Sequence, residues 1–432
     1  MSQSILIEGC PLSGKTSLLS SLQPLLPNIE IKVKGIFFEQ HEKHWSLWNK
    51  ANRPFNTVII VLEADPVCLL EREKELKQGK NEYTTSFFFL KRYRYRQLSA
   101  FYGNVHLIDT TKLSKEEVAK VVKDIYENKT KEYIVPCVDE YTQEMFDALP
   151  KVIEGESKII RTFNKRFQII QYKASVHSHK QQRSGIVEGT DKERMKMTKS
   201  IIDIFSRYEI KHSYFFIGEN FILNESLNPE KDLPPVEIIV KRCFVGSDKV
   251  RYYKMEELKN RFGQPVIKKE KQNEYQKLLV RFDYRNPNYN PETKQPMGDI
   301  PLCDDLADEF INAEVAKKTA KFIFSVLDEH FSKMNLYFED VCFMLTVEGD
   351  VMYGEVSQDC GRYKYIHEHK YELSELYNIH EDSDHVFLEK IYEKILELKN
   401  SKFVIRNLDD SSRPCYIIKA VSEHHLKFMS KN

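Results

Sequence analysis

The feature that most constrains this fold is the stretch Gly9–Thr16, with the sequence GCPLSGKT. It fits the pattern G-x-x-x-x-G-K-[ST] without a mismatch, after an apolar run at Ser4–Glu8 and before a helical pattern at Ser17–Leu22. The glycines of such a loop let the backbone wrap around a phosphate, with its N–H groups pointing inward. The pattern therefore predicts a nucleoside triphosphate site, in this chain or in an ancestor of it.

Each residue of this loop has an expected task. Lys15 is expected to reach the β- and γ-phosphates of ATP, which gives it a catalytic role, and Thr16 to coordinate Mg²⁺. The N-terminus of the following helix adds its partial positive charge. The predicted ATP-binding residues are Gly9, Ser13, Gly14, Lys15, Thr16 and Ser17.

Length and composition limit the class of protein. A chain of 432 residues is expected to form two or three domains. Lys+Arg and Asp+Glu balance at 65 each, so the net charge indicates neither a nucleic-acid nor a membrane partner. The eight cysteines show no metal-ligand spacing, which favours free thiols. With no secretory signal and no apolar run of roughly 18 residues, we expect a cytoplasmic protein.

The first 130 residues alternate between strand and helix patterns. Strands are predicted at 29–38, 57–62 and 105–109, and helices at 86–102 and 114–127. The strand at 57–62 is continuously apolar, as buried parallel strands are. This order predicts an α/β domain with a parallel sheet around the phosphate site.

Several of these residues resemble the thymidylate kinase and deoxynucleoside kinase group of P-loop kinases. They are Ile7-Glu8-Gly9 leading into Ser13–Thr16, the strand end Leu62–Pro66 with Arg72 behind it, and the late Ile108-Asp109. The resemblance implies a kinase-like fold, ATP as phosphoryl donor and a nucleotide as acceptor. The chain departs from the group in lacking its acidic–arginine pair after the next strand.

The remaining catalytic candidates come from the same domain. Glu39 is the acidic group placed to act as a base or as an Mg²⁺ partner. Arg72, with Lys74 and Lys77, is a candidate lid over the phosphates. The alternative is that these three form the solvated face of a helix, and the sequence leaves both open.

The second half has a different pattern. A hairpin or meander, long helices and antiparallel strands predict an α+β unit. Strands are expected at 152–161, 167–172, 236–242, 336–346 and 350–356, and helices at 189–208, 308–331 and 384–398.

The order of these pieces resembles phosphoribosylaminoimidazole-succinocarboxamide synthase, or SAICAR synthetase, an ATP-grasp-related family. The residues that carry the resemblance are Glu154–Lys158, Pro235–Lys241, Gly246–Arg251, Asp340 and Ser357–Arg362. The family activates a carboxylate with ATP and joins it to the amino group of aspartate. The resemblance therefore implies an amide ligase of purine metabolism.

The positions expected to handle Mg²⁺–ATP in that family are altered here. Phosphoryl transfer is stabilised almost wholly by electrostatics, so it needs cations and metal-binding carboxylates. Glu156 and Cys342 stand in place of lysines, Met344 in place of a glutamate and Gly354 in place of an aspartate. Groups suited to a ribose-phosphate compound are largely present. The predicted substrate-binding residues are Lys158, Ser175, Lys241, Ser247, Arg251 and Arg362.

The predicted organisation is a P-loop kinase-like domain at 1–130, a linker at 131–150 and a SAICAR synthetase-like domain at 151–432. Three functions remain open. The first is a two-domain enzyme that phosphorylates a nucleotide or related small molecule and binds a ribose-phosphate compound. The second is an ATP-dependent amide ligase with an altered metal site, and the third a nucleotide-sensing or scaffold protein. A homo-oligomer is compatible with each.

Overall fold

The computed structural model describes residues 4–365 with gaps. The larger gaps are 34–56, 77–82, 245–257 and 269–273, and the shorter ones are 104, 156, 179–182, 187–188, 286–289, 291, 295–296 and 334–335. Predictions on Glu39, Lys77, Glu156, Ser247, Arg251 and everything after 365 lie outside the described residues.

The N-terminal sheet has the strand order β2-β1-β3-β4-β5. Four of its strands run parallel and β5 joins antiparallel, which confirms the predicted parallel arrangement. The strands are β1 (Ser4–Gly9), β2 (Glu30–Val33), β3 (Thr57–Glu63), β4 (Val105–Asp109) and β5 (Ile134–Val135).

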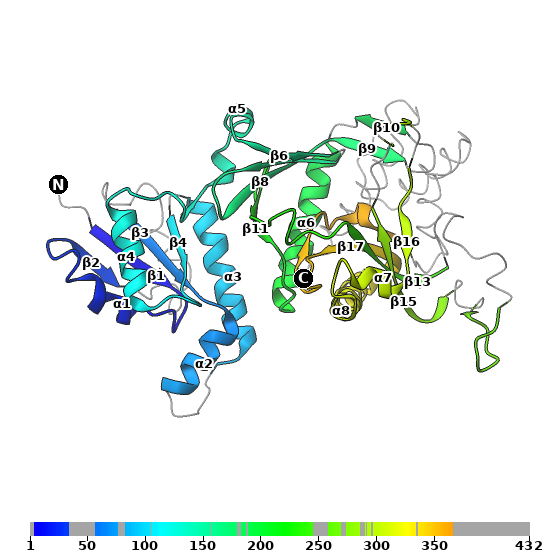
Figure 1. The fold of residues 1–432 in the computed structure, drawn as a ribbon, viewed down its shortest axis with the longest axis horizontal. Helices are drawn as coiled ribbons and strands as arrows, with labels where there is room; N and C mark the ends of the chain where they lie inside the picture. The colour runs from blue at the N-terminus through cyan, green and yellow to red at the C-terminus, as the bar shows by residue number, and fades with distance from the viewer. Residues whose placement is uncertain are drawn as a thin grey trace.

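Helices cover both faces of this sheet (Figure 1). On one face, α1 (Lys15–Leu22) and α4 (Lys115–Tyr126) pack against alternate strand residues such as Ile5 and Ile60. On the other, α2 (Pro66–Leu76) and α3 (Thr85–Tyr102) cover the intervening residues. A capping box begins α4 at Ser114, since the Ser114 and Glu117 side chains each bond the other's backbone N–H.

The segment 131–150, expected to be a linker, is packed structure. Besides β5 it contains η4 (Val138–Glu140) and α5 (Gln143–Asp147). Phe146 is fully buried, and its ring stacks on that of Phe221 with centroids 5.0 Å apart. The two apolar anchors Val138 and Phe146 are hidden in the sequence among polar residues and Pro136, which is why the pattern resembled a linker.

Two large antiparallel sheets and a separate two-stranded sheet form the described part of the second half, as the α+β prediction requires. The first has the order β11-β12-β8-β7-β6. Its strands are β6 (Lys151–Glu154), β7 (Lys158–Thr162), β8 (Phe167–Tyr172), β11 (Tyr214–Ile217) and β12 (Ile222–Glu225), and the hairpin β9 (Ser175–Ser178) and β10 (Arg183–Ile186) and helix α6 (Thr190–Arg207) lie between β8 and β11 in the chain.

The second antiparallel sheet is built around β13, β15 and β17. The helix expected at 308–331 begins only at Ala313, after its cap Asn312, and Asp308 instead ends a separate short helix. The strand expected at 350–356 is shorter. The elements are β13 (Val236–Cys243), β14 (Ile267–Lys268), β15 (Glu274–Tyr284), β16 (Ile300–Leu302), α7 (Asp304–Asp308), α8 (Ala313–Ser332), β17 (Leu336–Leu345), β18 (Met352–Tyr353), η8 (Gln358–Cys360) and β19 (Gly361–Tyr365).

Helix α3 stands between the N-terminal sheet and β11 (Figure 1). Its buried residues Phe88 and Tyr95 belong to one hydrophobic cluster with Phe167 and Ile169 of β8 and Phe215 of β11. The parallel sheet and the first antiparallel sheet therefore share a core rather than folding around separate ones.

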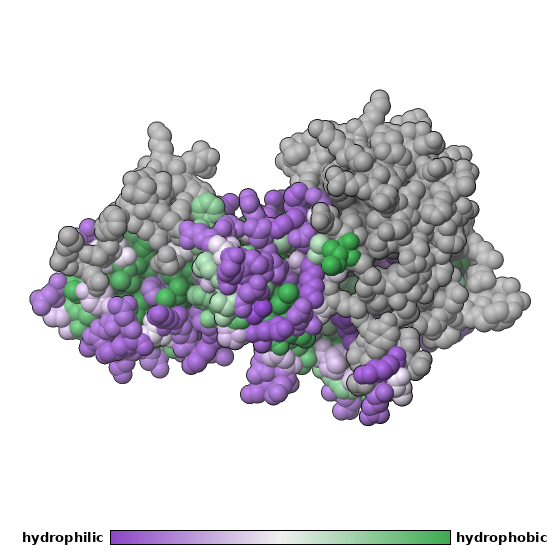
Figure 2. All heavy atoms as spheres, turned by 90° about the horizontal axis from the view of Figure 1, so that it is seen from above, coloured by the Kyte–Doolittle hydropathy of each residue, from purple (hydrophilic) through white to green (hydrophobic). Residues whose placement is uncertain are grey.

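The surface formed by the described residues is mostly hydrophilic on the side seen in Figure 2, with hydrophobic residues in small separate patches. Among these residues, no helix is both long enough and apolar enough to cross a membrane.

Candidate functional site

The loop between β1 and α1 has the backbone that a close approach requires. Gly9 has φ +141, and a Cβ there would lie 2.0 Å from the carbonyl oxygen of Leu62 on the neighbouring strand. Gly14 at the start of α1 has φ +93. Both conformations strongly favour glycine, so the two glycines of the motif are explained by the geometry of the loop.

Lys15 folds back into this loop. Its ammonium group donates to the carbonyl oxygens of Gly9 at 2.8 Å and Cys10 at 2.7 Å. Burial lowers the pKa of Lys15. The hydroxyl of Ser13 is buried and has no hydrogen-bond partner among the described residues. A lysine, an unsatisfied hydroxyl and a helix N-terminus thus converge on one loop, which fits the oxygens of a phosphate.

Thr16 and Ser17 are exposed in the first turn of α1. Within the part of the chain that the structure describes, no group of three or more His, Cys, Asp and Glu side chains is placed to hold a metal ion.

Arg72 of α2 lies against the same loop. It donates to the carbonyl oxygen of Leu12 at 3.3 Å and to the carbonyl oxygen of Thr110 at 2.7 Å. These partners are neutral oxygens, so these contacts leave its positive charge uncompensated. Lys74, predicted alongside it, is exposed on the same helix. The structure thus brings Arg72 to the loop, whereas Lys74 is on the solvated face.

A buried carboxylate that the sequence did not single out lies beside the loop. Glu63, the last residue of β3, has no exposed surface and accepts hydrogen bonds from three arginines. The closest donor atoms lie at 3.2 Å for Arg92, 2.8 Å for Arg96 and 2.6 Å for Arg166. Burial alone would raise the pKa of Glu63, but the three guanidinium groups outweigh it and hold that pKa well below its usual value.

This network extends to two further carboxylates. Arg92 also bonds Asp109 at the end of β4 at 3.2 Å, and Arg96 bonds Glu225 of β12 at 2.9 Å. Three arginines therefore meet three carboxylates, and the network is neutral overall. Because Glu63 is occupied by arginines, it is not a metal ligand in this arrangement.

Two of the predicted ribose-phosphate residues meet at one carboxylate in the second half. Lys241 of β13 and Arg362 of β19 both bond Asp340 of β17, at 3.1 and 2.7 Å. Lys241 and Asp340 are buried, whereas the Arg362 side chain is 45% exposed. Ser175 is half-buried at the start of β9.

Lys158 belongs to a second charged cluster. The pKa of Lys158 is lowered, because burial outweighs the opposite effect of the nearby Glu355 carboxylate. Arg194 of α6 pairs with Glu355 at 3.1 Å, and the hydroxyl of Ser357 donates to the same carboxylate at 2.6 Å. Three of the predicted substrate residues are thus divided between two clusters, with Lys241 and Arg362 at Asp340 and Lys158 at Glu355.

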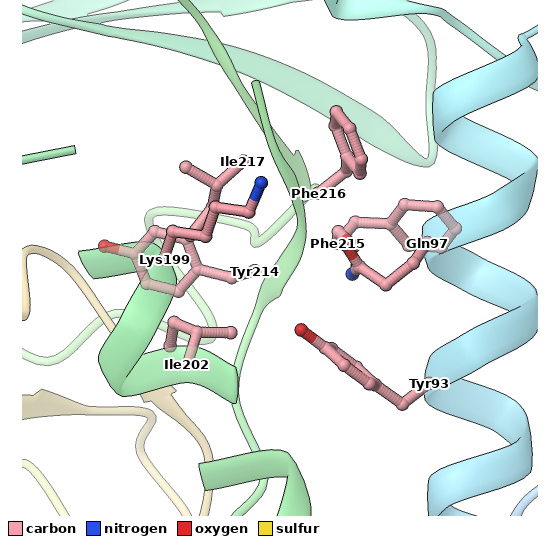
Figure 3. Close-up of a pocket in the computed structure, with 8 residues that line it drawn as sticks. All are labelled: Tyr93, Gln97, Lys199, Ile202, Tyr214, Phe215, Phe216 and Ile217. Atoms are coloured by element: carbon pink, nitrogen blue, oxygen red, sulfur yellow. Dashed lines mark hydrogen bonds between the residues drawn. The ribbon is translucent and has the colours of Figure 1, made fainter. Parts of the chain in front are cut away.

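A narrow pocket with no room for a water molecule lies where α3 meets α6 and β11 (Figure 3). Tyr93 reaches across to Asp203 at 2.5 Å, and Gln97 donates to the carbonyl oxygen of Phe215 at 2.6 Å. Ligand pockets usually measure about 300–1,000 Å³. This space is therefore a packing gap between the two halves rather than a ligand site.

Comparison with known proteins gives distant similarities. No protein-family model matches the chain. The bifunctional cordycepin biosynthesis cluster protein 3 of Cordyceps militaris is 22% identical over 252 residues, which is 50% of this chain and 28% of that protein. The match therefore spans less than a third of the curated relative.

Solved SAICAR synthetases align with more than half of this chain. One in complex with ADP has 18% identity and a TM-score of 0.42 over 57% of this chain and 97% of its own. The enzyme of Pyrococcus horikoshii has 17% identity and a TM-score of 0.41 over 56% of this chain and 98% of its own. The enzyme of Saccharomyces cerevisiae, complexed with SAICAR, has 12% identity and a TM-score of 0.43 over 66% of this chain and 98% of its own. These scores are low, and none of these proteins is named as a P-loop kinase.

Proposed function

We propose that this chain is an ATP-dependent phosphotransferase that acts on a nucleotide or a related small molecule, with ATP held by the loop Gly9–Thr16. The observation that carries the proposal is the placement of two cations, Lys15 and Arg72, on the carbonyl oxygens of that loop. Within the described residues, both cations donate hydrogen bonds to neutral oxygens. The arginines around Glu63, by contrast, donate to a carboxylate.

Cations that donate to carbonyl oxygens instead of carboxylates can exchange these partners for a polyphosphate, and the buried Glu8 nearby favours the charged form of Lys15. Binding of ATP would replace the Gly9 and Cys10 carbonyls with phosphate oxygens as partners of Lys15, and these charge-assisted bonds are the stronger ones. Arg72 would bind the same polyphosphate from the side of α2. Mg²⁺, held by Thr16, would supply neutralisation of the phosphate charge. Glu39 is retained in the proposal as the base.

In this proposal the second half of the chain binds a ribose-phosphate compound. Lys241 and Arg362 around Asp340 are two of the residues that would bind its phosphate, together with Ser247 and Arg251. In the full proposal, residues 1–130 bind ATP and residues 151–432 bind the ribose-phosphate compound.

Isothermal titration of the full chain with Mg²⁺–ATP tests the ATP site. We expect one site, with affinity lowered at least about 10-fold in Lys15→Ala and in Arg72→Ala, because each loses a charge-assisted bond. Lys74→Ala is the matched control, since it removes an exposed cation from the same helix. Unchanged affinity in Lys15→Ala would overturn the proposal.

A second candidate is the amide ligase, favoured by the cluster of Lys158, Arg194 and Glu355. It predicts ADP release that needs an amino acid such as aspartate and survives Lys15→Ala. The sensing alternative predicts ATP binding without acceptor-dependent turnover.

A further inference from the structure

Thr110 joins the ends of three strands at the phosphate loop. It follows the last residue of β4 directly, is only 3% exposed, and its N–H donates to the carbonyl oxygen of Glu63 at 2.8 Å. Its hydroxyl lies 3.1 Å from the carbonyl oxygen of Ser13 and 3.0 Å from that of Glu63. Because β3 lies between β1 and β4, this hydroxyl reaches over the end of the central strand to the loop that follows β1.

The same residue holds Arg72. One guanidinium nitrogen donates to the carbonyl oxygen of Thr110 at 2.7 Å, and the other to its hydroxyl at 3.2 Å and to the carbonyl oxygen of Leu12 at 3.3 Å. Loop and arginine are therefore attached to one buried side chain.

We propose that Thr110 is a positioning residue that fixes both the Leu12–Ser13 part of the loop and the guanidinium of Arg72 for the bound polyphosphate. This inference rests on the proposed function. A hydroxyl has one proton and two lone pairs, so it can donate to the Ser13 or Glu63 carbonyl while it accepts from Arg72. A serine hydroxyl could make the same two hydrogen bonds. Valine has nearly the shape of threonine but has no hydroxyl.

The proposal predicts a specific set of affinities. Thr110→Val should weaken Mg²⁺–ATP binding to the full chain about 10-fold, because the loop carbonyl and Arg72 both lose a partner. Thr110→Ser should retain most of the wild-type affinity for Mg²⁺–ATP. Thr57→Val is the matched control, since the Thr57 hydroxyl bonds Ser4 at the opposite end of the same sheet, at 2.9 Å.

A double-mutant cycle separates positioning from general structure. If Thr110 acts through Arg72, then Thr110→Val should weaken binding far less in an Arg72→Ala background than in the wild type. A purely structural threonine would give additive losses. Thr110→Val should also lower kcat/KM for ATP, and by far less in the Arg72→Ala background than in the wild type.

The outcomes can be told apart. Wild-type affinity in Thr110→Val, or additive losses in the double variant, would overturn the positioning role while the ATP site stands. Absence of ATP binding in the wild type, or no effect of Lys15→Ala, would overturn the proposed function and this inference with it. Should Thr110→Val fail to show a cooperative thermal transition, Thr110→Ala carries the same prediction.

Discussion

Arg166 donates to the carboxylate of Glu63 at 2.6 Å, and so connects the start of β8 with the end of β3. The same arginine donates to the carbonyl oxygen of Leu107 in β4 at 2.7 Å. Since Glu63 pairs along the sheet with β4 and lies next to the strand that ends in the phosphate loop, a residue of the second half supports the edge on which ATP is proposed to bind.

Glu63→Gln should be strongly destabilising. The substitution leaves three arginines without their shared buried counter-charge, a change that typically costs about 3–5 kcal/mol. Urea unfolding of the full chain measures it. Glu225→Gln, at a 31% exposed side chain that pairs with Arg96, is the control and should cost less. A loss below about 1 kcal/mol for Glu63→Gln would contradict a structural role for the network.

Acid should destabilise the chain partly through His106 of β4. Burial lowers the pKa of this imidazole from 6.5 to about 4. Between these values the unfolded state binds the proton and the folded state does not, so the contribution of His106 to stability is complete above 6.5 and is lost as the pH falls towards 4. His106→Gln should flatten the dependence of the unfolding free energy on pH in that window. An equally steep dependence in the variant would contradict this assignment.

Cys10 should resist alkylation although it belongs to the loop. It has no exposed surface, and burial raises the pKa of its thiol to about 12. Only the thiolate reacts, so iodoacetamide at mildly alkaline pH should modify the exposed Cys303 and spare Cys10 in the native chain. Peptide mapping by mass spectrometry reads this directly. Equal modification of both cysteines would show that the loop opens in solution.

Arg362→Ala should weaken binding of phosphorylated ribosides by about 10-fold, because a charge-assisted bond to phosphate is lost. Arg242→Ala is the matched control: Arg242 follows Lys241 on β13 but pairs with Asp328 instead of Asp340. Titration with a ribose 5-phosphate compound gives the comparison. Unchanged affinity in Arg362→Ala would remove the ribose-phosphate assignment.

Features with a local cause could be predicted from the sequence. The phosphate loop is fixed by Gly9 and Gly14, and the capping box at Ser114 was visible from the spacing of its two side chains. The start of α2 likewise follows from Asp65, whose carboxylate accepts from the N–H of Val67 at 2.9 Å.

Features made by distant residues could not be predicted. Glu63 and Arg166 are 103 positions apart, and Thr110 and Ser13 are 97 apart. In the sequence, Arg92 and Arg96 belong to a basic helical run that resembles a solvated face, and Thr110 belongs to an ordinary turn. Nothing in their spacing shows that the fold buries them beside the loop. The available signal was the pair of acidic residues at the ends of two predicted strands, Glu63 and Asp109, since buried arginines need carboxylates.

In the proposed reaction, ATP held by the loop Gly9–Thr16 gives its terminal phosphoryl group to an acceptor. The most direct measurement is ADP release from Mg²⁺–ATP in the presence of nucleosides, nucleoside monophosphates and ribose-phosphate compounds, for the wild type and Lys15→Ala, with and without aspartate. We expect turnover that depends on one acceptor class, needs no aspartate and is lost in Lys15→Ala. Acceptor-dependent turnover that persists in Lys15→Ala, or no turnover with any acceptor, would contradict it.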